Sequence, residues 1–230
     1  ARVPTCSDRH KTATRKTPDM FTGIITGLGQ IIDSQPLGAD ASHGRRLTVQ
    51  APAGYLDDVG LGDSIAHNGA CMTVTTLDLP ARCFTIDVSA ESLERTVGLT
   101  EQGRVNLEKA TRPHDRLGGH LVTGHVDGVG EVTRFEPVGE SWLLRIRAPQ
   151  ALARFLAYKG SITVNGVSLT VNQVDDAQDG STQFSINLIP HTIENTTLGE
   201  LQVGSKVNLE VDLIARYVER MLASGAKLGA

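Results

Sequence analysis

Most of the chain alternates between apolar and polar residues in short runs that end at Gly, Pro or Asp. Runs of this kind, rich in β-branched residues, predict β-strands. Five or six strands at this spacing in each half of the chain predict an all-β fold of two small, closed or nearly closed antiparallel barrels. The strongest runs are residues 44–52, 64–78, 82–89, 141–149, 160–174 and 182–190.

Helical patterns are few. Residues 53–60 and 150–160 each fit a short helical turn after an Ala-Pro pair, and helix starts are predicted near Ser89 and His191. In the last segment apolar residues recur at 213, 214, 217, 218, 221 and 222. That spacing predicts an α-helix with Asp212 as its N-cap and Gly225 as its stop. The apolar stripe of this helix either packs on the adjacent barrel or associates with copies of itself.

The chain carries the same sequence pattern twice. TGIITGLG at 22–29 matches TGHVDGVG at 123–130, and SIAHNGACMTV at 64–74 matches SITVNGVSLTV at 161–171. FTIDVSAESLERT at 84–96 matches FSINLIPHTIENT at 184–196, while VNLE recurs unchanged at 105–108 and 207–210. Four blocks in one order indicate a tandem duplication, and each copy is long enough to be a domain. The expected units are residues 20–118, 119–211 and a terminal helix and tail at 212–230.

Composition narrows the functional class. The 230 residues carry a net charge of −4, which argues against nucleic acid as a partner. No apolar window is long enough to predict a membrane-spanning helix. The cysteines are Cys6, Cys71 and Cys83; an odd count without a secretory signal predicts a reducing compartment, the cytoplasm. Because no CxxC or HExxH spacing occurs, a metal site is not expected.

Residues 1–19 differ from the rest. They are basic and polar and lack the apolar core of a secretory signal, so we expect a disordered extension. Met20 resembles a natural start. A transit-peptide remnant is the alternative interpretation.

The repeated NG motif carries the first candidate site. In the strand that follows each NG, alternation sends larger apolar side chains to one face and small hydrogen-bonding groups to the other. The polar face is well sized for a flat heterocycle lying against the backbone; an ordinary solvent-exposed strand face is the alternative. The polar residues are Cys71 and Thr73 in the first copy, and Ser168 and Thr170 in the second.

Two histidines lie in GGHLVTGHVDG at 118–128. A regular strand would place His120 and His125 on opposite faces, which disfavours a shared metal. His125 lies inside a repeated block where the first copy has Ile24, so the two copies differ by a group that titrates near neutrality. This difference is expected if two similar sites play different chemical roles; a merely structural or exposed histidine is the alternative. Lys159 and Asp212 are further polar candidates.

MFTGIITGLG, GDSIAHNGACMTV, GGHLVTGHVDG, YKGSITVNGVSLTV and LIPHTIENTTLG together resemble the riboflavin synthase alpha-chain family, from Met20 to about Leu222. The resemblance implies two six-stranded Greek-key barrels, a helix that assembles a homotrimer, and no cofactor. It implies dismutation of two 6,7-dimethyl-8-ribityllumazine molecules, by transfer of a four-carbon unit, to riboflavin and 5-amino-6-ribitylaminouracil. This is the last step of riboflavin biosynthesis. Each active site is expected between the N-terminal barrel of one subunit and the C-terminal barrel of its neighbour, and lumazine synthase is a candidate protein partner.

The resemblance also implies roles for individual residues. His125 is the expected proton-transfer group, hydrogen-bonded to Ser168 and Thr170, and Cys71 adds to or polarises the acceptor. Ala70 stands where the family often has a second cysteine. The expected catalytic residues are Phe21, Ser64, Cys71, His125, Ser168 and Asp212. The expected ligand-holding residues are Gly23, Ile24, Ile25, Cys71, Met72, Thr73, Asp87, Val88, Ser89, Ala90, Glu91, Ser92, Gly124, His125, Val126, Lys159, Ser168, Leu169, Thr170, Leu188, Ile189, Pro190, His191, Thr192 and Ile193.

Two other functions are possible for a duplicated chain of this kind. Relatives of the family keep the double barrel but only bind a lumazine or flavin, and such a protein should lose site residues in one copy. A tandem-barrel interaction module should retain no polar set across both copies. The polar residues of both NG strands, together with Phe21, His125 and Asp212, favour the enzyme.

Overall fold

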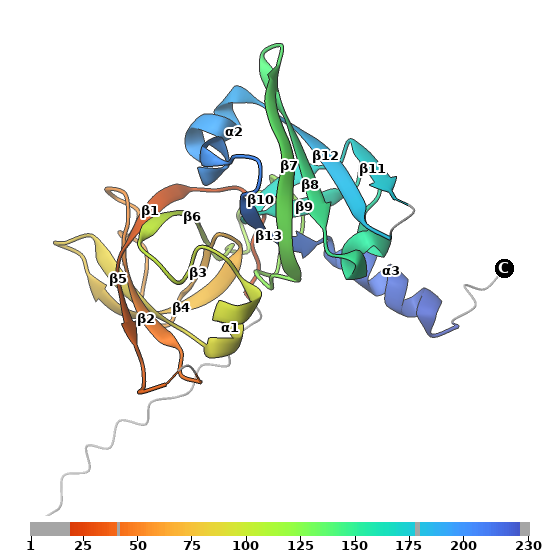
Figure 1. The fold of residues 1–230 in the computed structure, drawn as a ribbon. Helices are drawn as coiled ribbons and strands as arrows, with labels where there is room; N and C mark the ends of the chain where they lie inside the picture. The colour runs from red at the N-terminus through yellow and green to blue at the C-terminus, as the bar shows by residue number, and fades with distance from the viewer. Residues whose placement is uncertain (1–18, 41, 178–179, 226–230) are drawn as a thin grey trace, which may run out of the picture.

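A computed structural model describes residues 19–40, 42–177 and 180–225. Cys6 and nearly all of the expected N-terminal extension lie outside the described residues. The fold is mostly β and consists of two halves that lie side by side, with a helix at the C-terminal end (Figure 1).

The first half is a closed barrel, as the alternating pattern predicts. Its strands pair antiparallel in the order β1-β2-β5-β4-β3-β6, in which β2 returns beside β5 as in a Greek key. Helix α1 (Ala90–Arg95) follows, and Ser89 caps it by accepting a hydrogen bond from the Ser92 N–H. The strands are β1 (Gly27–Pro36), β2 (Arg45–Gln50), β3 (Ser64–His67), β4 (Ala70–Asp78), β5 (Cys83–Val88) and β6 (Gly103–Lys109).

The second half repeats this strand order around a sheet that is split at one place. The order is β10-β9-β13-β7-β8-β12-β11, and the two edge strands are consecutive pieces of one segment, interrupted at Val171 and Asn172. Together β10 and β11 take the place of β4, so the sheet is a seven-stranded half-barrel. The strands are β7 (Gly128–Val138), β8 (Ser141–Ala148), β9 (Ser161–Val164), β10 (Val167–Thr170), β11 (Gln173–Asp176), β12 (Thr182–Leu188) and β13 (Lys206–Val211).

The short helical predictions are partly met. Residues 150–160 contain the 3₁₀-helix η1 (Gln150–Phe155), and α2 (Pro190–Asn195) begins one residue before the predicted start, with Pro190 in the first turn. A second 3₁₀-helix, η2 (Thr197–Glu200), follows α2. Residues 53–60 form a series of turns but no regular helix. The reason is Gly54, whose φ of 76° is left-handed and cannot continue a right-handed helix.

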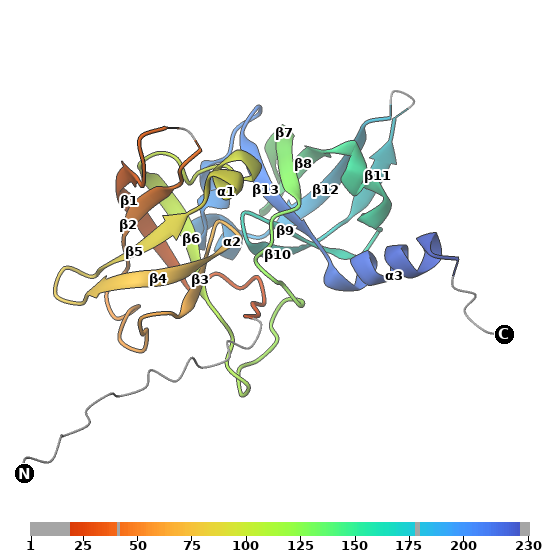
Figure 2. The same ribbon diagram turned by 90° about the horizontal axis from the view of Figure 1, so that it is seen from below.

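The terminal helix α3 (Leu213–Ala223) has the predicted cap, because Asp212 accepts a hydrogen bond from the Ile214 N–H at 2.9 Å. Figure 2 shows α3 extending away from both sheets. Its apolar stripe is exposed, with Tyr217 at 65% and Leu222 at 62%. Within one chain, therefore, the stripe does not pack on the barrel.

The two halves meet where their NG hairpins touch. Asn68 and Gly69 have φ of 46° and 86°, and Asn165 and Gly166 have 48° and 79°, as the two central residues of a type I′ turn require. A Cβ on Gly69 would lie 2.9 Å from the Gly166 nitrogen. Glycine is therefore needed both for the turn and for the approach of the two backbones.

The asparagines of the two VNLE motifs lock this contact. The Asn106 side chain donates to the Asn165 carbonyl at 2.9 Å, and the Asn208 side chain donates to the Asn68 carbonyl at 3.0 Å. All four asparagines are buried. The bonds are related by an approximate internal two-fold axis, which agrees with a duplicated sequence.

One core position breaks the internal symmetry. His67 is fully buried beside Phe84, while Val164 is its counterpart in the second half. The His67 Nδ1–H donates to the Ile65 carbonyl at 3.0 Å, and in the described part of the chain its Nε2 finds no hydrogen-bond partner. Burial lowers the pKa of His67 to about 4, so the folded protein holds a neutral imidazole.

This burial makes stability depend on pH. Because the folded-state pKa of His67 lies below its unfolded value of 6.5, its contribution is complete above pH 6.5 and is lost as pH falls toward 4. The loss amounts to about 3 kcal/mol of unfolding free energy. We expect His67→Val, which copies the second half, to be less stable at pH 7 but to lose less stability between pH 7 and 4.5. Urea unfolding at several pH values measures the unfolding free energy of both proteins. An unfolding free energy that falls equally with pH in parent and variant would contradict the prediction.

Candidate functional site

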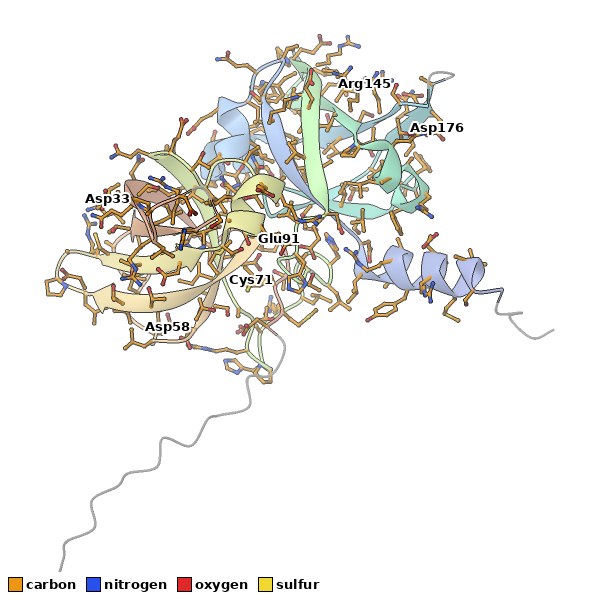
Figure 3. All side chains as sticks on the ribbon, turned by 60° about the horizontal axis from the view of Figure 1, so that its bottom comes forward. Asp33, Asp58, Cys71, Glu91, Arg145 and Asp176 are labelled. Carbon is orange, nitrogen blue, oxygen red and sulfur yellow. The ribbon has the colours of Figure 1, made fainter. Side chains whose placement is uncertain are left out.

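A pocket of about 280 Å³ opens between the two halves beside β4. One wall is Ala70 to Met72 of β4, a second is formed by α1, and the third is the Gly124–Val126 turn from the other half. Figure 3 places Cys71 and Glu91 on the side of the first half that faces the second. We call this space the N-half pocket. Seven of the residues that line it were predicted from the sequence to hold ligand: Cys71, Met72, Glu91, Ser92, Gly124, His125 and Val126.

The Gly124 turn can approach Cys71 closely because both residues are small. The Cys71 N–H donates to the Gly124 carbonyl at 2.8 Å. A Cβ on Gly124, where φ is 74°, would lie 2.6 Å from the Cys71 Cβ. The backbone of the Gly124 turn and that of β4 therefore meet directly at the wall of the N-half pocket.

The second half repeats the arrangement with different chemistry. The Ser168 N–H donates to the Gly23 carbonyl at 2.8 Å, and a Cβ on Gly23 would lie 2.6 Å from the Ser168 Cβ. The turn at Gly23 thus crosses from the first half to the strand of the second half. By the correspondence of the two repeats, we call this place, where the Gly23 turn meets Ser168 of β10, the C-half pocket.

His120, which the sequence pattern does not assign to the site, contacts Ser168. Its Nδ1 lies 2.7 Å from the Ser168 Oγ and its side chain is buried. Its Nε2 has no hydrogen-bond partner among the residues that the structure describes. Burial lowers the pKa of His120, while the nearby Asp212 carboxylate opposes this shift. A neutral imidazole hydrogen-bonded to a hydroxyl can accept that hydroxyl's proton.

A sequence signal for His120 does exist in the glycines before it. A Cβ on Gly119 would lie 2.0 Å from the Thr22 carbonyl oxygen and 2.7 Å from the Ser168 Cβ. Glycine at this position lets the loop pass between the first-half turn and β10, which brings His120 to Ser168.

His125 lies elsewhere than its expected partner. Its exposed side chain lines the N-half pocket with Cys71. Ser168 is hydrogen-bonded to His120 instead. The two histidines therefore belong to different pockets. Thr170 lies further along β10, paired with Ser161, and is exposed.

Other predicted catalytic residues surround these pockets. Phe21 is buried at the junction, where its backbone pairs with Val122. Ser64 is buried in β3 and donates to the Asp19 carboxylate at 2.6 Å, beside a larger cavity of about 950 Å³. Asp212 caps α3 and lies close enough to His120 to affect its charge.

Several predicted ligand-holding residues make other contacts. Lys159 donates to the Asn172 side chain at 2.9 Å. Asp87 binds Arg46 through two hydrogen bonds of 2.7 and 2.8 Å. The side chains of Val88 and Leu188 are fully buried in the two cores. The remaining members lie in the first-half turn (Ile24, Ile25), in β4 and α1 (Thr73, Ser89, Ala90) and in the second half (Leu169, Ile189, Pro190, His191, Thr192, Ile193).

Among the residues that the structure describes, no group of three or more His, Cys, Asp or Glu side chains is placed to hold a metal ion. None of the described helices is long and apolar enough to cross a membrane.

Comparison with known proteins is specific. The model of the lumazine binding domain matches residues 22–110 and again residues 123–212. The chain is 48% identical to the riboflavin synthase of Mycobacterium bovis over 208 residues, which is 89% of this chain and 99% of the relative. It is 43% identical to that of Bacillus subtilis over 205 residues, 88% of this chain and 90% of the relative.

Solved structures agree on the fold. LumP complexed with 6,7-dimethyl-8-(1'-D-ribityl) lumazine matches with a TM-score of 0.70 at 25% identity, over 83% of this chain and 98% of LumP. LumP complexed with riboflavin matches with the same TM-score at 26% identity, over the same shares of the two chains. With two matching domains and close relatives along most of its length, the chain belongs to the riboflavin synthase family and carries the lumazine binding domain twice.

Proposed function

We propose that the protein is a riboflavin synthase, a transferase that converts two molecules of 6,7-dimethyl-8-ribityllumazine to riboflavin and 5-amino-6-ribitylaminouracil. One molecule donates a four-carbon unit and the other accepts it. The observation that carries the proposal is the pair of similarly built contacts, Gly124 on Cys71 and Gly23 on Ser168, because donor and acceptor are the same compound. Holding two reactants in a fixed relation raises their effective concentration, which is a large term for a bimolecular step.

The two pockets offer different chemical groups to identical ligands. In the C-half pocket the Ser168 hydroxyl and the neutral His120 imidazole form a pair that can move a proton. The lumazine 7-methyl group is unusually acidic, so a modest base suffices to remove its proton. In the N-half pocket Cys71 and His125 lie on the wall, where they can polarise or add to the second lumazine. Different partners for the two copies support distinct donor and acceptor roles.

The proposal includes a homotrimer, with each active site shared between the N half of one subunit and the C half of its neighbour. The exposed apolar stripe of α3 supports this assembly, because large apolar patches usually mark protein contacts. A cytoplasmic location and association with lumazine synthase belong to the same proposal.

The reaction itself is the first prediction of this proposal. Purified protein mixed with 6,7-dimethyl-8-ribityllumazine alone, in the presence of a chelator, should form one riboflavin for every two lumazines consumed, followed by absorbance. Tight binding without riboflavin would instead favour a lumazine- or flavin-binding protein, the function suggested by the fold of LumP. No binding at all would leave only an interaction module.

A second prediction separates proton transfer from binding. We expect His125→Ala and His120→Ala to slow turnover by about 10²-fold or more while lumazine affinity falls much less, because general acid–base groups act on the transition state. His43→Ala, in the exposed hairpin between β1 and β2, is the matched control and should leave turnover unchanged. Turnover equal to the parent in either site variant would remove that histidine from the mechanism.

A third prediction concerns α3. Val218 and Leu222 are exposed in the single chain and would be buried in the proposed trimer. Placing glutamate at both should convert the trimer to a monomer and abolish turnover, since burying a charge is costly. Arg220→Glu, on the same helix but outside the apolar stripe, should remain a trimer. Sedimentation velocity measures both. A monomeric parent, or a trimeric double variant, would contradict the role of the stripe.

A further inference from the structure

The two VNLE motifs contain a pair of glutamates that the proposed reaction does not use. Glu108 and Glu210 are 4% and 2% exposed, which is rare for ionisable residues. Strand alternation places the Val and Leu of each motif in a core and the Asn and Glu on the opposite face. That face is also buried, because it meets the other half.

Each glutamate binds one TG turn. The Glu210 carboxylate accepts hydrogen bonds from the Thr123 N–H and hydroxyl, both at 2.7 Å. It also accepts from the N–H groups of Gly124 at 3.0 Å and His125 at 3.1 Å. Four donors that converge on one carboxylate hold three successive residues of the turn in a single conformation.

Glu108 makes the equivalent contacts in the first copy. It accepts from the Thr22 N–H at 2.7 Å, the Thr22 hydroxyl at 2.9 Å and the Gly23 N–H at 3.0 Å. Burial raises the pKa of both glutamates, and the N–H groups that point at each carboxylate oppose the rise. The turns, rather than a buried cation, supply the hydrogen bonds that compensate for desolvation.

The turns held in this way close the pockets of the opposite halves. The Gly124 carbonyl, fixed by Glu210, accepts from the Cys71 N–H in the N-half pocket. The Gly23 carbonyl, fixed by Glu108, accepts from the Ser168 N–H in the C-half pocket. Each carboxylate therefore holds a turn of its own half, and that turn is bonded to a strand of the other half.

We propose that Glu108 and Glu210 are positioning residues that act crosswise: Glu210 sets the pocket that contains Cys71 and His125, and Glu108 sets the pocket that contains Ser168 and His120. The pockets are ligand sites only if the proposed function holds, but the crosswise positioning is a property of the backbone and can be measured without ligand. Neither carboxylate is among the residues that line the N-half pocket.

The test uses Glu210→Gln and Glu108→Gln in the full chain. Glutamine has nearly the same volume as glutamate, but one carboxylate oxygen is replaced by an NH₂ group, which cannot accept a hydrogen bond from the turn. Part of the turn therefore loses its hydrogen bonds. We expect amide hydrogen exchange, measured by NMR, to quicken at least tenfold at Cys71 in Glu210→Gln and to stay within twofold at Ser168. Glu108→Gln should give the reverse pattern.

Control variants distinguish a general loss of structure from a loss of crosswise positioning. Glu140→Gln, at an exposed turn, removes a charge and should change neither amide. Thr123→Val and Thr22→Val remove only the hydroxyl donor and should give the same crosswise pattern, more weakly, even if a glutamine variant folds poorly. Equal quickening at both amides in one variant, or quickening in the wrong pocket, would overturn the proposal.

Turnover of 6,7-dimethyl-8-ribityllumazine is measured in parallel. We expect each glutamine variant to lower kcat at least tenfold, with opposite effects on the two amides. A parent that forms no riboflavin while the crosswise exchange pattern persists would overturn the proposed function and leave the positioning role standing. Riboflavin formation by the parent, without the crosswise exchange pattern in the variants, would overturn the positioning role and leave the proposed function standing.

Discussion

The contact between the two NG hairpins is the constraint on which the rest of the structure depends. Gly69 and Gly166 lie so close that neither can carry a side chain, and the buried asparagine side chains bond across the gap in both directions. Buried amides without partners would cost several kcal/mol, so these bonds fix one relative placement of the halves. The symmetric pair of bonds gives the asparagine of each VNLE motif the same role in both copies.

Once the halves are placed, each pocket is shared between them. The strand after NG comes from one half and the turn that closes over it from the other, as the hydrogen bonds from Cys71 to Gly124 and from Ser168 to Gly23 show. Neither half holds a complete pocket by itself. Duplication therefore provides two similar sites whose geometry is linked through a single buried interface, while the polar groups on each strand remain free to differ.

Chemical asymmetry is built on this symmetric frame. Ser168 meets a buried histidine, whereas Cys71 shares its pocket with an exposed one. The two cores also differ at one corresponding position, which is His67 in the first half and Val164 in the second. Among the described residues the buried His67 Nε2 has no hydrogen-bond partner. The frame is held by the glycines, asparagines and glutamates of the repeat, and the differences lie at positions beside it.

The sequence alone determined the features that depend on local pattern. Alternation predicted the strand regions, Asp212 predicted the start of α3, and the four repeated blocks predicted the duplication and the family. Only the tertiary structure decided which histidine meets Ser168, why the VNLE glutamates are buried, and that the stripe of α3 is exposed. The pairs that settle the first two questions are about 50 to 90 residues apart in the chain. Period-two and period-3.6 patterns report which face of an element is apolar, but they carry no information about which distant element that face meets.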